Sequence, residues 1–287
     1  MLVQRVITAV VLLAVLAGAL LAASPWPLVV LLGLAAACAL WEWLRLTWPN
    51  KPSAVPAALG LLFFVFAMAL SFQWLGDEPS LQVLALSAAL GGWLVPAVGI
   101  AWVVGATVLV VRGNAQGRAG SICLSLFAIA AVVAAWTALV QLYLALGAWF
   151  LVSLMALIWC ADIAAYFSGK AFGRHKLAPR VSPGKTWEGA VGGIAAATLW
   201  VFVSRWWPGS FGDVLAARWP WWGVAIIAVL LAALSIVGDL FESLLKRRAG
   251  VKDSSQLLPG HGGVFDRIDA LLPVAPIALL LSGVSMS

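Results

Sequence analysis

The chain alternates between long apolar runs and short polar segments along its whole length. A run of about 20 apolar residues is long enough to cross a bilayer as a helix, and a helix satisfies its backbone hydrogen bonds internally. The pattern therefore predicts an all-α, polytopic integral membrane protein. We expect about nine transmembrane helices, at 4–22, 27–46, 55–75, 83–111, 121–142, 148–168, 188–206, 221–241 and 264–284.

The fourth apolar run is longer than one span needs. Gly91, Gly92 and Pro96 offer a place where residues 83–111 could divide into an interfacial helix and a span. Glycine and proline are also tolerated inside membrane helices, so the sequence leaves both arrangements open.

Composition supports the membrane assignment. The chain is 64% hydrophobic and only 10% charged, whereas soluble domains are about 45–50% apolar. This difference argues against a soluble α-solenoid, the other fold that long helical patterns would suggest.

The basic residues orient the bundle. Of the 17 Lys and Arg residues, all but Arg205 and Arg218 fall in loops on the side of the N-terminus. Cytoplasmic loops carry such an excess, so we predict a cytoplasmic N-terminus, with Asp77 and Glu78 in an outer loop. The basic residues assigned to the inner side are Arg5, Arg45, Lys51, Arg112, Arg118, Lys170, Arg174, Lys176, Arg180, Lys185, Lys246, Arg247, Arg248, Lys252 and Arg267.

The net charge of +6 then describes an inner face that attracts anionic lipid headgroups and nucleotides. We expect no nucleic-acid partner, because no basic soluble domain is available to hold a duplex. The first 24 residues also have features of a signal peptide. We expect an uncleaved first span instead, since cleavage would upset the alternation of loop charge.

Polar chemistry is concentrated in the second half of the chain. The inner loops at 169–187 and 242–263 are basic and rich in Gly, Ser and Pro, whereas the earlier loops are short. We expect residues 1–142 to form a transmembrane scaffold and residues 143–287 to form a catalytic transmembrane region that contains the two loops.

Asp162 lies inside the sixth predicted span, about two turns from its inner end. A carboxylate at that depth is costly and is a functional candidate by default. The alternative is a helix-end carboxylate paired with a neighbouring Lys or Arg. Tyr166 follows four residues later and shares the same helix face.

Asp239, Glu242, Ser243 and Lys246 share one face of the helix that ends the eighth span, because they are spaced by three and four residues. Glu242 and Lys246 could form an ordinary ion pair. That explanation does not suit Asp239, which follows an apolar run and lies near membrane depth.

Asp266 and Asp269 are one turn apart at the start of the last predicted span. Acidic residues there can simply complement the helix dipole. Two carboxylates so close together also suit a hard cation such as Mg²⁺, which takes oxygen ligands and bridges phosphates.

The loops offer candidate phosphate contacts. Glycines at 260, 262 and 263 allow backbone N–H groups to approach a phosphate, and His261 could donate to one or bond to the backbone instead. Residues 182–186 do not form a Walker A loop, because Pro179 stands where its first glycine would be. Lys185 and Thr186 remain candidate phosphate contacts, although Thr186 could equally cap the next helix.

Taken together, these residues resemble the signature of the phosphatidate cytidylyltransferase (CDP-diacylglycerol synthase) family. The resemblance covers about 143–285 and includes Asp162 with Tyr166, the Phe172-Gly173 turn and the segment from Ser182 to Glu188. The positions that match the signature are Ser243, Lys246, Arg247, Lys252, Asp253, Pro259, His261, Gly262, Gly263, Asp266, Arg267 and Asp269.

The resemblance implies that CTP and phosphatidic acid react to give CDP-diacylglycerol and pyrophosphate, with Mg²⁺ and a second, monovalent cation such as K⁺. It also implies a homodimer among membrane lipids, which we expect in a bacterial inner membrane with the site facing the cytoplasm. The expected metal ligands are Asp239, Asp266 and Asp269. The expected phosphate contacts are Lys185, Thr186, Lys246, Arg247, Lys252, His261 and Arg267. The expected catalytic residues are Asp162, Ser243, Lys246, Lys252, Asp253, His261 and Asp269.

Two other functions remain open at this point. A CTP-dependent polyprenol kinase would release CDP instead of pyrophosphate. A transporter of anionic lipid or phosphate would also place charges within the membrane, but transporters often show paired repeats, which are not evident here.

Overall fold

The computed structural model describes residues 2–48, 54–76 and 78–285, and the side chains of residues 2, 3 and 5 are outside the description. The predicted inner-loop residue Lys51 and the predicted outer-loop residue Asp77 therefore lie outside the described residues. The helices of the first part are α1 (Leu2–Leu21), α2 (Trp26–Thr47), α3 (Val55–Trp74), α4 (Leu81–Ala89), α5 (Val95–Ile100) and α6 (Thr107–Arg112). The second part contains α7 (Ile122–Phe172), β1 (Lys176–Ala178), β2 (Ser182–Thr186), α8 (Trp187–Ser204), α9 (Phe211–Arg218), α10 (Trp221–Ala249), α11 (Phe265–Ile268) and α12 (Leu271–Ser282).

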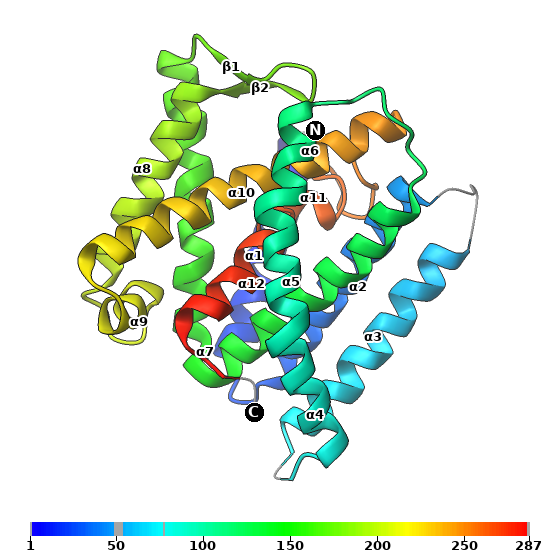
Figure 1. Cartoon of the computed structure of the whole chain (residues 1–287), viewed down its shortest axis with the longest axis vertical. Helices are drawn as coiled ribbons and strands as arrows, with labels where there is room; N and C mark the ends of the chain where they lie inside the picture. The colour runs from blue at the N-terminus through cyan, green and yellow to red at the C-terminus, as the bar shows by residue number, and fades with distance from the viewer. Residues whose placement is uncertain (1, 49–53, 77, 286–287) are drawn as a thin grey trace.

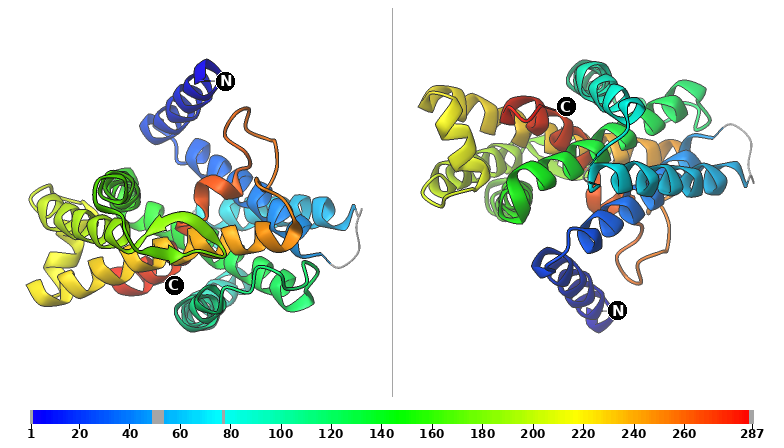
Figure 2. Two further views of the ribbon diagram at one scale, coloured as in Figure 1. Left: turned by 90° about the horizontal axis from the view of Figure 1, so that it is seen from above. Right: turned by 90° about the horizontal axis from the view of Figure 1, so that it is seen from below.

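The helices form a bundle (Figure 1), from which α1 projects (Figure 2). Within the described residues, six helices are long and apolar enough to cross a membrane, and one of them, α7, covers two predicted spans. The first and last predicted spans correspond to shorter apolar helices at 6–21 and Leu271–Ser282. The structure is thus helical and suited to a membrane, as predicted, while the count of nine spans and the cytoplasmic N-terminus stay predictions.

The fifth and sixth predicted spans are joined directly within α7, where we expected a loop. The joint is Gly147, whose φ of 83° and ψ of 177° are non-helical. Only glycine adopts this conformation readily, since it has no Cβ. In Figure 1 the helix changes direction along its length and returns toward the β-hairpin.

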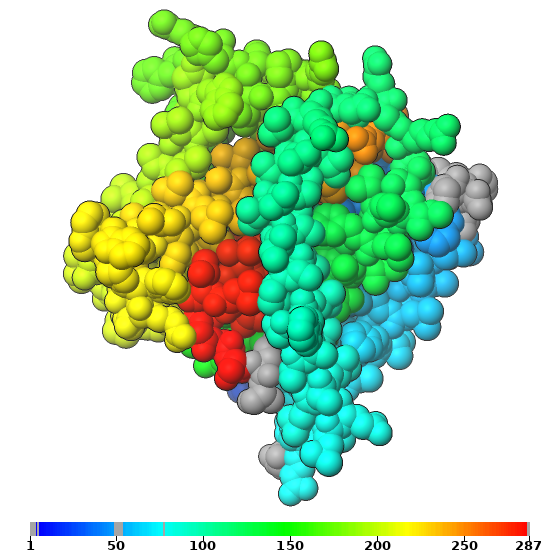
Figure 3. All heavy atoms as spheres, in the orientation of Figure 1, coloured from blue at the N-terminus to red at the C-terminus, as the bar shows by residue number. Residues whose placement is uncertain are grey.

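The fourth predicted span is continuous from Leu81 to Arg112. Two π-helical segments, η1 (Leu90–Leu94) and η2 (Ala101–Ala106), join α4, α5 and α6. These wider turns absorb the irregularity that Pro96 introduces near the start of α5. Figure 3 shows this long helix lying across one face of the molecule, beside α12.

The two inner loops contain more regular structure than we expected. In 169–187, α7 continues to Phe172 and β1 pairs with β2 as an antiparallel hairpin, so the all-α prediction misses a small sheet. In 242–263, α10 continues to Ala249 and ends at Gly250, which has a φ of 71°. Glu242, Ser243 and Lys246 therefore lie on a helix, as their spacing predicted.

A cluster of aromatic side chains from α2, α10, α11 and η2 packs together in the core. Trp43 of α2 is fully buried and stacks on Phe265 of α11, with ring centroids 5.1 Å apart and planes at 10°. It also contacts Phe241 of α10 and Trp102 of η2. The first half of the chain therefore packs directly against the segment that carries the signature.

Candidate active site

Two cavities adjoin where α7, α10 and the β-hairpin meet. The hairpin cavity has a volume of about 400 Å³ and lies between α7, α8, α10 and β2. The acidic cavity has a volume of about 510 Å³ and lies between α7, α10 and residues 266–271. Asp162 and Asp239 line both cavities. These two predicted site residues, from helices far apart in sequence, mark the boundary between them.

The acidic cavity is lined by six carboxylates and two cations. The carboxylates are Asp162, Asp239, Glu242, Asp253, Asp266 and Asp269, and the cations are Lys246 and Arg267. The structure therefore brings together three sets of acidic residues that the sequence offered separately. Among the described residues, however, no group of three or more His, Cys, Asp or Glu side chains is arranged as a ready-made metal site.

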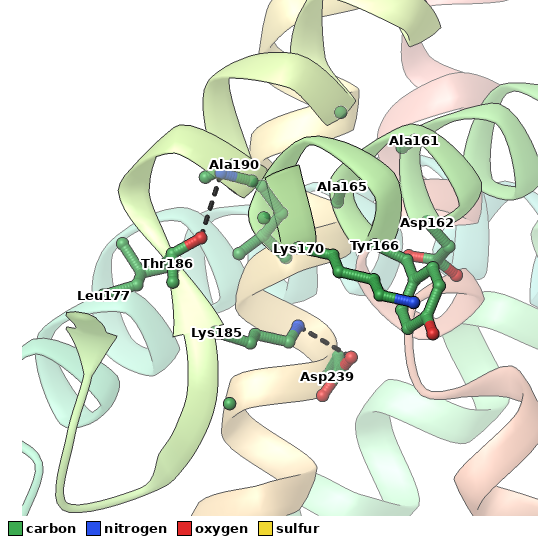
Figure 4. Close-up of a pocket in the computed structure, with 15 residues that line it drawn as sticks. Ala161, Asp162, Ala165, Tyr166, Lys170, Leu177, Lys185, Thr186, Ala190 and Asp239 are labelled. Atoms are coloured by element: carbon green, nitrogen blue, oxygen red, sulfur yellow. Dashed lines mark hydrogen bonds and ion pairs between the residues drawn. The ribbon is translucent and has the colours of Figure 1, made fainter. Parts of the chain in front are cut away.

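Lys185 reaches from β2 across to α10. Its Nζ lies 2.7 Å from Oδ2 of Asp239, and both side chains are partly exposed. Figure 4 shows this pair across the hairpin cavity from Asp162, Tyr166 and Lys170 on α7. The Ser243 hydroxyl lies 3.5 Å from Oδ1 of Asp239, and Ser243 lines neither cavity as described, so its catalytic role stays a prediction.

Lys246 is held between two carboxylates. Its Nζ lies 2.6 Å from Oε2 of Glu242 and 2.6 Å from Oδ1 of Asp266. The ion pair between Glu242 and Lys246, which we considered as the plain alternative, is confirmed. The contact with Asp266 crosses from α10 to α11 and could not be read from helical spacing.

Asp266 is engaged through both oxygens. Its Oδ2 accepts hydrogen bonds from the Ser254 amide at 3.0 Å, the Ser254 hydroxyl at 2.9 Å and the Gly263 amide at 2.7 Å. Asp266 lies on α11, before the last apolar helix. Burial alone would raise its pKa, but the bonds from Lys246 and the Gly263 amide and the charge of Lys246 lower it. The group is therefore an ionised carboxylate held by the protein.

Asp269 follows α11 directly, so Asp266 and Asp269 do not share one continuous last span as predicted. A hydrogen bond from the Ala270 amide to its Oδ1, at 2.9 Å, orients this carboxylate. Asp253 lies on the loop after α10 and is exposed. Asp239 and Asp269 thus accept fewer hydrogen bonds from the protein than Asp266 does.

Other predicted phosphate contacts lie at the margin of this site. Arg267 donates to the carbonyl oxygen of His261 through Nη2 at 2.8 Å, which braces the glycine-rich turn. Arg247 donates to the carbonyl of Val181, and Lys252 is exposed. His261, Arg247 and Lys252 do not line either cavity as described. Nδ1 of His261 is buried and has no hydrogen-bond partner among the described residues.

Thr186 lines the hairpin cavity but also serves as a helix cap. Its hydroxyl accepts a hydrogen bond from the Gly189 amide at 3.1 Å at the start of α8. The capping alternative for Thr186 is therefore confirmed, and its contact with phosphate stays a prediction.

Sequence reasoning missed Glu42 of α2. This carboxylate is fully buried and accepts hydrogen bonds from the segment that leads into α11. A signal was available, because Glu42 is an acidic residue within a predicted span, the same feature that singled out Asp162.

The chain is similar to known proteins along almost its whole length. Residues 3–284 match the model of the cytidylyltransferase family. The chain is 40% identical to a phosphatidate cytidylyltransferase of Pseudomonas aeruginosa, over 96% of this chain and 95% of that protein. It is 35% identical to a phosphatidate cytidylyltransferase of Haemophilus influenzae, over 96% of both chains. The chain belongs to the cytidylyltransferase family.

Proposed function

We propose that the protein transfers the cytidylyl group of CTP to phosphatidic acid, giving CDP-diacylglycerol and pyrophosphate for phospholipid synthesis. The observation that carries this proposal is the pair of adjoining cavities that share Asp162 and Asp239. A reaction between a lipid phosphate and a nucleotide needs two substrates to meet at one point. Relatives along almost the whole chain are named phosphatidate cytidylyltransferase, which supports the same reaction.

For this reaction the protein mainly has to position the two substrates and neutralise the charge of their phosphates. The phosphate of phosphatidic acid is already an anionic nucleophile, so it needs no strong base. One of its oxygens bonds to the α-phosphorus of CTP, the bond from that phosphorus to the bridging oxygen of the β-phosphate breaks, and pyrophosphate leaves. Lys185 pairs with the shared carboxylate Asp239, and Lys246 pairs with Asp266 in the acidic cavity, so both cations would neutralise the phosphates.

Mg²⁺ fits the charge of the acidic cavity. A cavity lined by six carboxylates and two cations would repel a triphosphate, and a bound divalent cation would reverse that repulsion. Mg²⁺ usually keeps several waters and takes one or two carboxylates, so it does not require a complete protein cage. We expect Asp239 and Asp269 to hold it, and Asp266 to join them after exchange with Lys246. A monovalent cation such as K⁺ would further reduce the negative charge.

The lipid would enter sideways from the bilayer while CTP arrives from the cytoplasm. Exposed apolar side chains on α7 and α8, including Ile163, Phe167 and Val191, support lateral entry beside the hairpin cavity. The basic inner loops support a cytoplasmic site in a bacterial inner membrane. A homodimer, expected from the family resemblance, would cover part of the exposed apolar surface.

The test uses purified protein in detergent with phosphatidic acid, Mg²⁺ and CTP labelled at the α-phosphate. The expected result is labelled lipid with an equal amount of pyrophosphate. Labelled CDP in place of pyrophosphate, with polyprenol as acceptor, would indicate the kinase instead. No transfer to either lipid, with an active control enzyme in the same mixture, would refute the proposal.

A further inference from the structure

Glu42 is a buried carboxylate that the proposed chemistry does not use. It lies on α2, is 0% exposed, and is more than 200 residues before its partners in sequence. Oε1 accepts hydrogen bonds from the Ser255 hydroxyl at 2.5 Å and the Val264 amide at 3.1 Å. Oε2 accepts them from the Ser254 hydroxyl at 3.0 Å and the Phe265 amide at 2.6 Å. All four donors belong to the segment 254–265.

These bonds complete the start of α11. The first N–H groups of a helix have no partner within the helix. Val264, the N-cap of α11, provides no side-chain cap, and a four-residue helix is too short to be stable alone. Glu42 supplies the missing acceptors from another helix, so the position of α11 depends on α2.

Ser254 links Glu42 to Asp266. Its hydroxyl oxygen lies 3.0 Å from Oε2 of Glu42 and 2.9 Å from Oδ2 of Asp266. One hydroxyl group thus lies within hydrogen-bonding distance of both carboxylates and connects them. Gly263 shows how closely the groups pack, because a Cβ at this position would collide with the Ser254 hydroxyl and the Glu42 carboxylate.

The neighbouring residue of α2 holds the other side of the same segment. Trp43 stacks on Phe265 with ring centroids 5.1 Å apart, while Glu42 binds the Phe265 amide. Polar and aromatic contacts from one turn of α2 therefore fix the residue immediately before Asp266.

We infer that Glu42 is a positioning residue for cytidylyl transfer: it holds the segment 254–265 so that Asp266 faces Lys246 and the acidic cavity. The inference rests on the proposed function. Glu42 itself does not line the acidic cavity as described, so its effect on the reaction passes through Ser254 and α11.

The first experiment compares Glu42→Gln with the parent protein. Glutamine has the same shape, but it replaces one acceptor oxygen by an NH₂ group. We expect kcat to fall about 10- to 100-fold through misplacement of the site. The KM for phosphatidic acid should change little, because Glu42 lies away from the hairpin cavity. Hydrogen exchange at the Val264 and Phe265 amides should become about tenfold faster or more, as local opening becomes easier.

Thr47→Val is the matched control on the same helix. Thr47 is also fully buried, and its hydroxyl lies 3.0 Å from the Ser125 hydroxyl and 3.2 Å from the Trp43 carbonyl oxygen, with no hydrogen bond to the segment 254–265 among the described residues. We expect this variant to lose stability while kcat and exchange at Val264 and Phe265 stay within about twofold, since the Thr47 hydroxyl shares no described hydrogen-bond partner with Glu42. Equal losses of kcat in Glu42→Gln and Thr47→Val would overturn the inference.

Ser254→Ala keeps a test available if Glu42→Gln does not fold. It removes the link to Asp266 but leaves three hydrogen bonds to Glu42 in place. We expect it to lower kcat, and the double variant to lose less than the product of the two single effects. Parent-like kcat in Ser254→Ala, or independent effects in the double variant, would refute positioning through Ser254. Hydrogen exchange does not depend on activity, so it still tests whether Glu42 holds the segment 254–265. Failure of the parent protein to make CDP-diacylglycerol would refute only the proposed function.

Discussion

Lys246 of α10 lies 2.6 Å from Asp266 of α11, and the same ammonium group lies 2.6 Å from Glu242. The three side chains are largely buried, with exposures of 15% for Lys246, 2% for Glu242 and 6% for Asp266. One cation thus joins the long helix to the segment that carries the signature aspartates.

Lys246→Met should therefore destabilise the protein strongly. It leaves two buried carboxylates without their cation, and breaking such a pair costs about 3–5 kcal/mol. We expect a clear fall in the unfolding temperature in detergent, with loss of transfer activity. Adding Glu242→Gln to Lys246→Met should recover part of the stability, because one unpaired charge is removed. An unchanged unfolding temperature in Lys246→Met would show that the three groups are not coupled as described.

Lys185→Ala should separate activity from stability. The Lys185 and Asp239 side chains are 27% and 37% exposed, and such pairs contribute only about 0–1 kcal/mol after screening. Lys185 lines the hairpin cavity and pairs with Asp239, which lines both cavities, so its removal should lower kcat/KM about 100-fold through lost charge stabilisation of the phosphates. Lys176→Ala, an exposed lysine on β1, is the matched control and should keep both activity and unfolding temperature. Equal activity in the two variants would remove Lys185 from the site.

Metal removal should abolish transfer. We expect a chelator to stop labelled lipid formation and added Mg²⁺ to restore it. Asp239→Asn and Asp269→Asn should each raise the Mg²⁺ concentration needed for half activity, because carboxylates are the ligands Mg²⁺ prefers. Glu78→Gln, an exposed acidic residue far along the chain from these residues, serves as control. Parent-like Mg²⁺ dependence in both aspartate variants would place the cation elsewhere.

Gly147→Ala should destabilise the bundle without any steric clash. A Cβ at this position would meet nothing within 4 Å, but the φ of 83° is unfavourable for alanine. Holding a non-glycine residue in such a region costs about 1–3 kcal/mol. We expect a lower unfolding temperature, and Gly105→Ala, inside η2 with open space around it, provides the comparison. If Gly147→Ala is as stable as the parent, the break in α7 does not require glycine.

The sequence predicted the helical membrane class because apolar runs are local features with a fixed length requirement. It also placed Glu242 and Lys246 on one helix face, since side chains four residues apart meet in any helix. The hairpin within 169–187 was missed, because it lies in a polar segment whose structure depends on packing against α8 and α10.

By itself, the sequence determined the apolar helices, the basic loops and the spacing of Asp239, Asp266 and Asp269. Only the tertiary structure decided that Asp162 and Asp239 share two cavities, that Lys246 bridges to Asp266, and that Glu42 holds α11. The physical reason is the range of each interaction. Helix periodicity is set by neighbours a few residues apart, whereas these contacts join residues that only the packing of α2, α7, α10 and α11 brings within hydrogen-bonding distance or into one cavity.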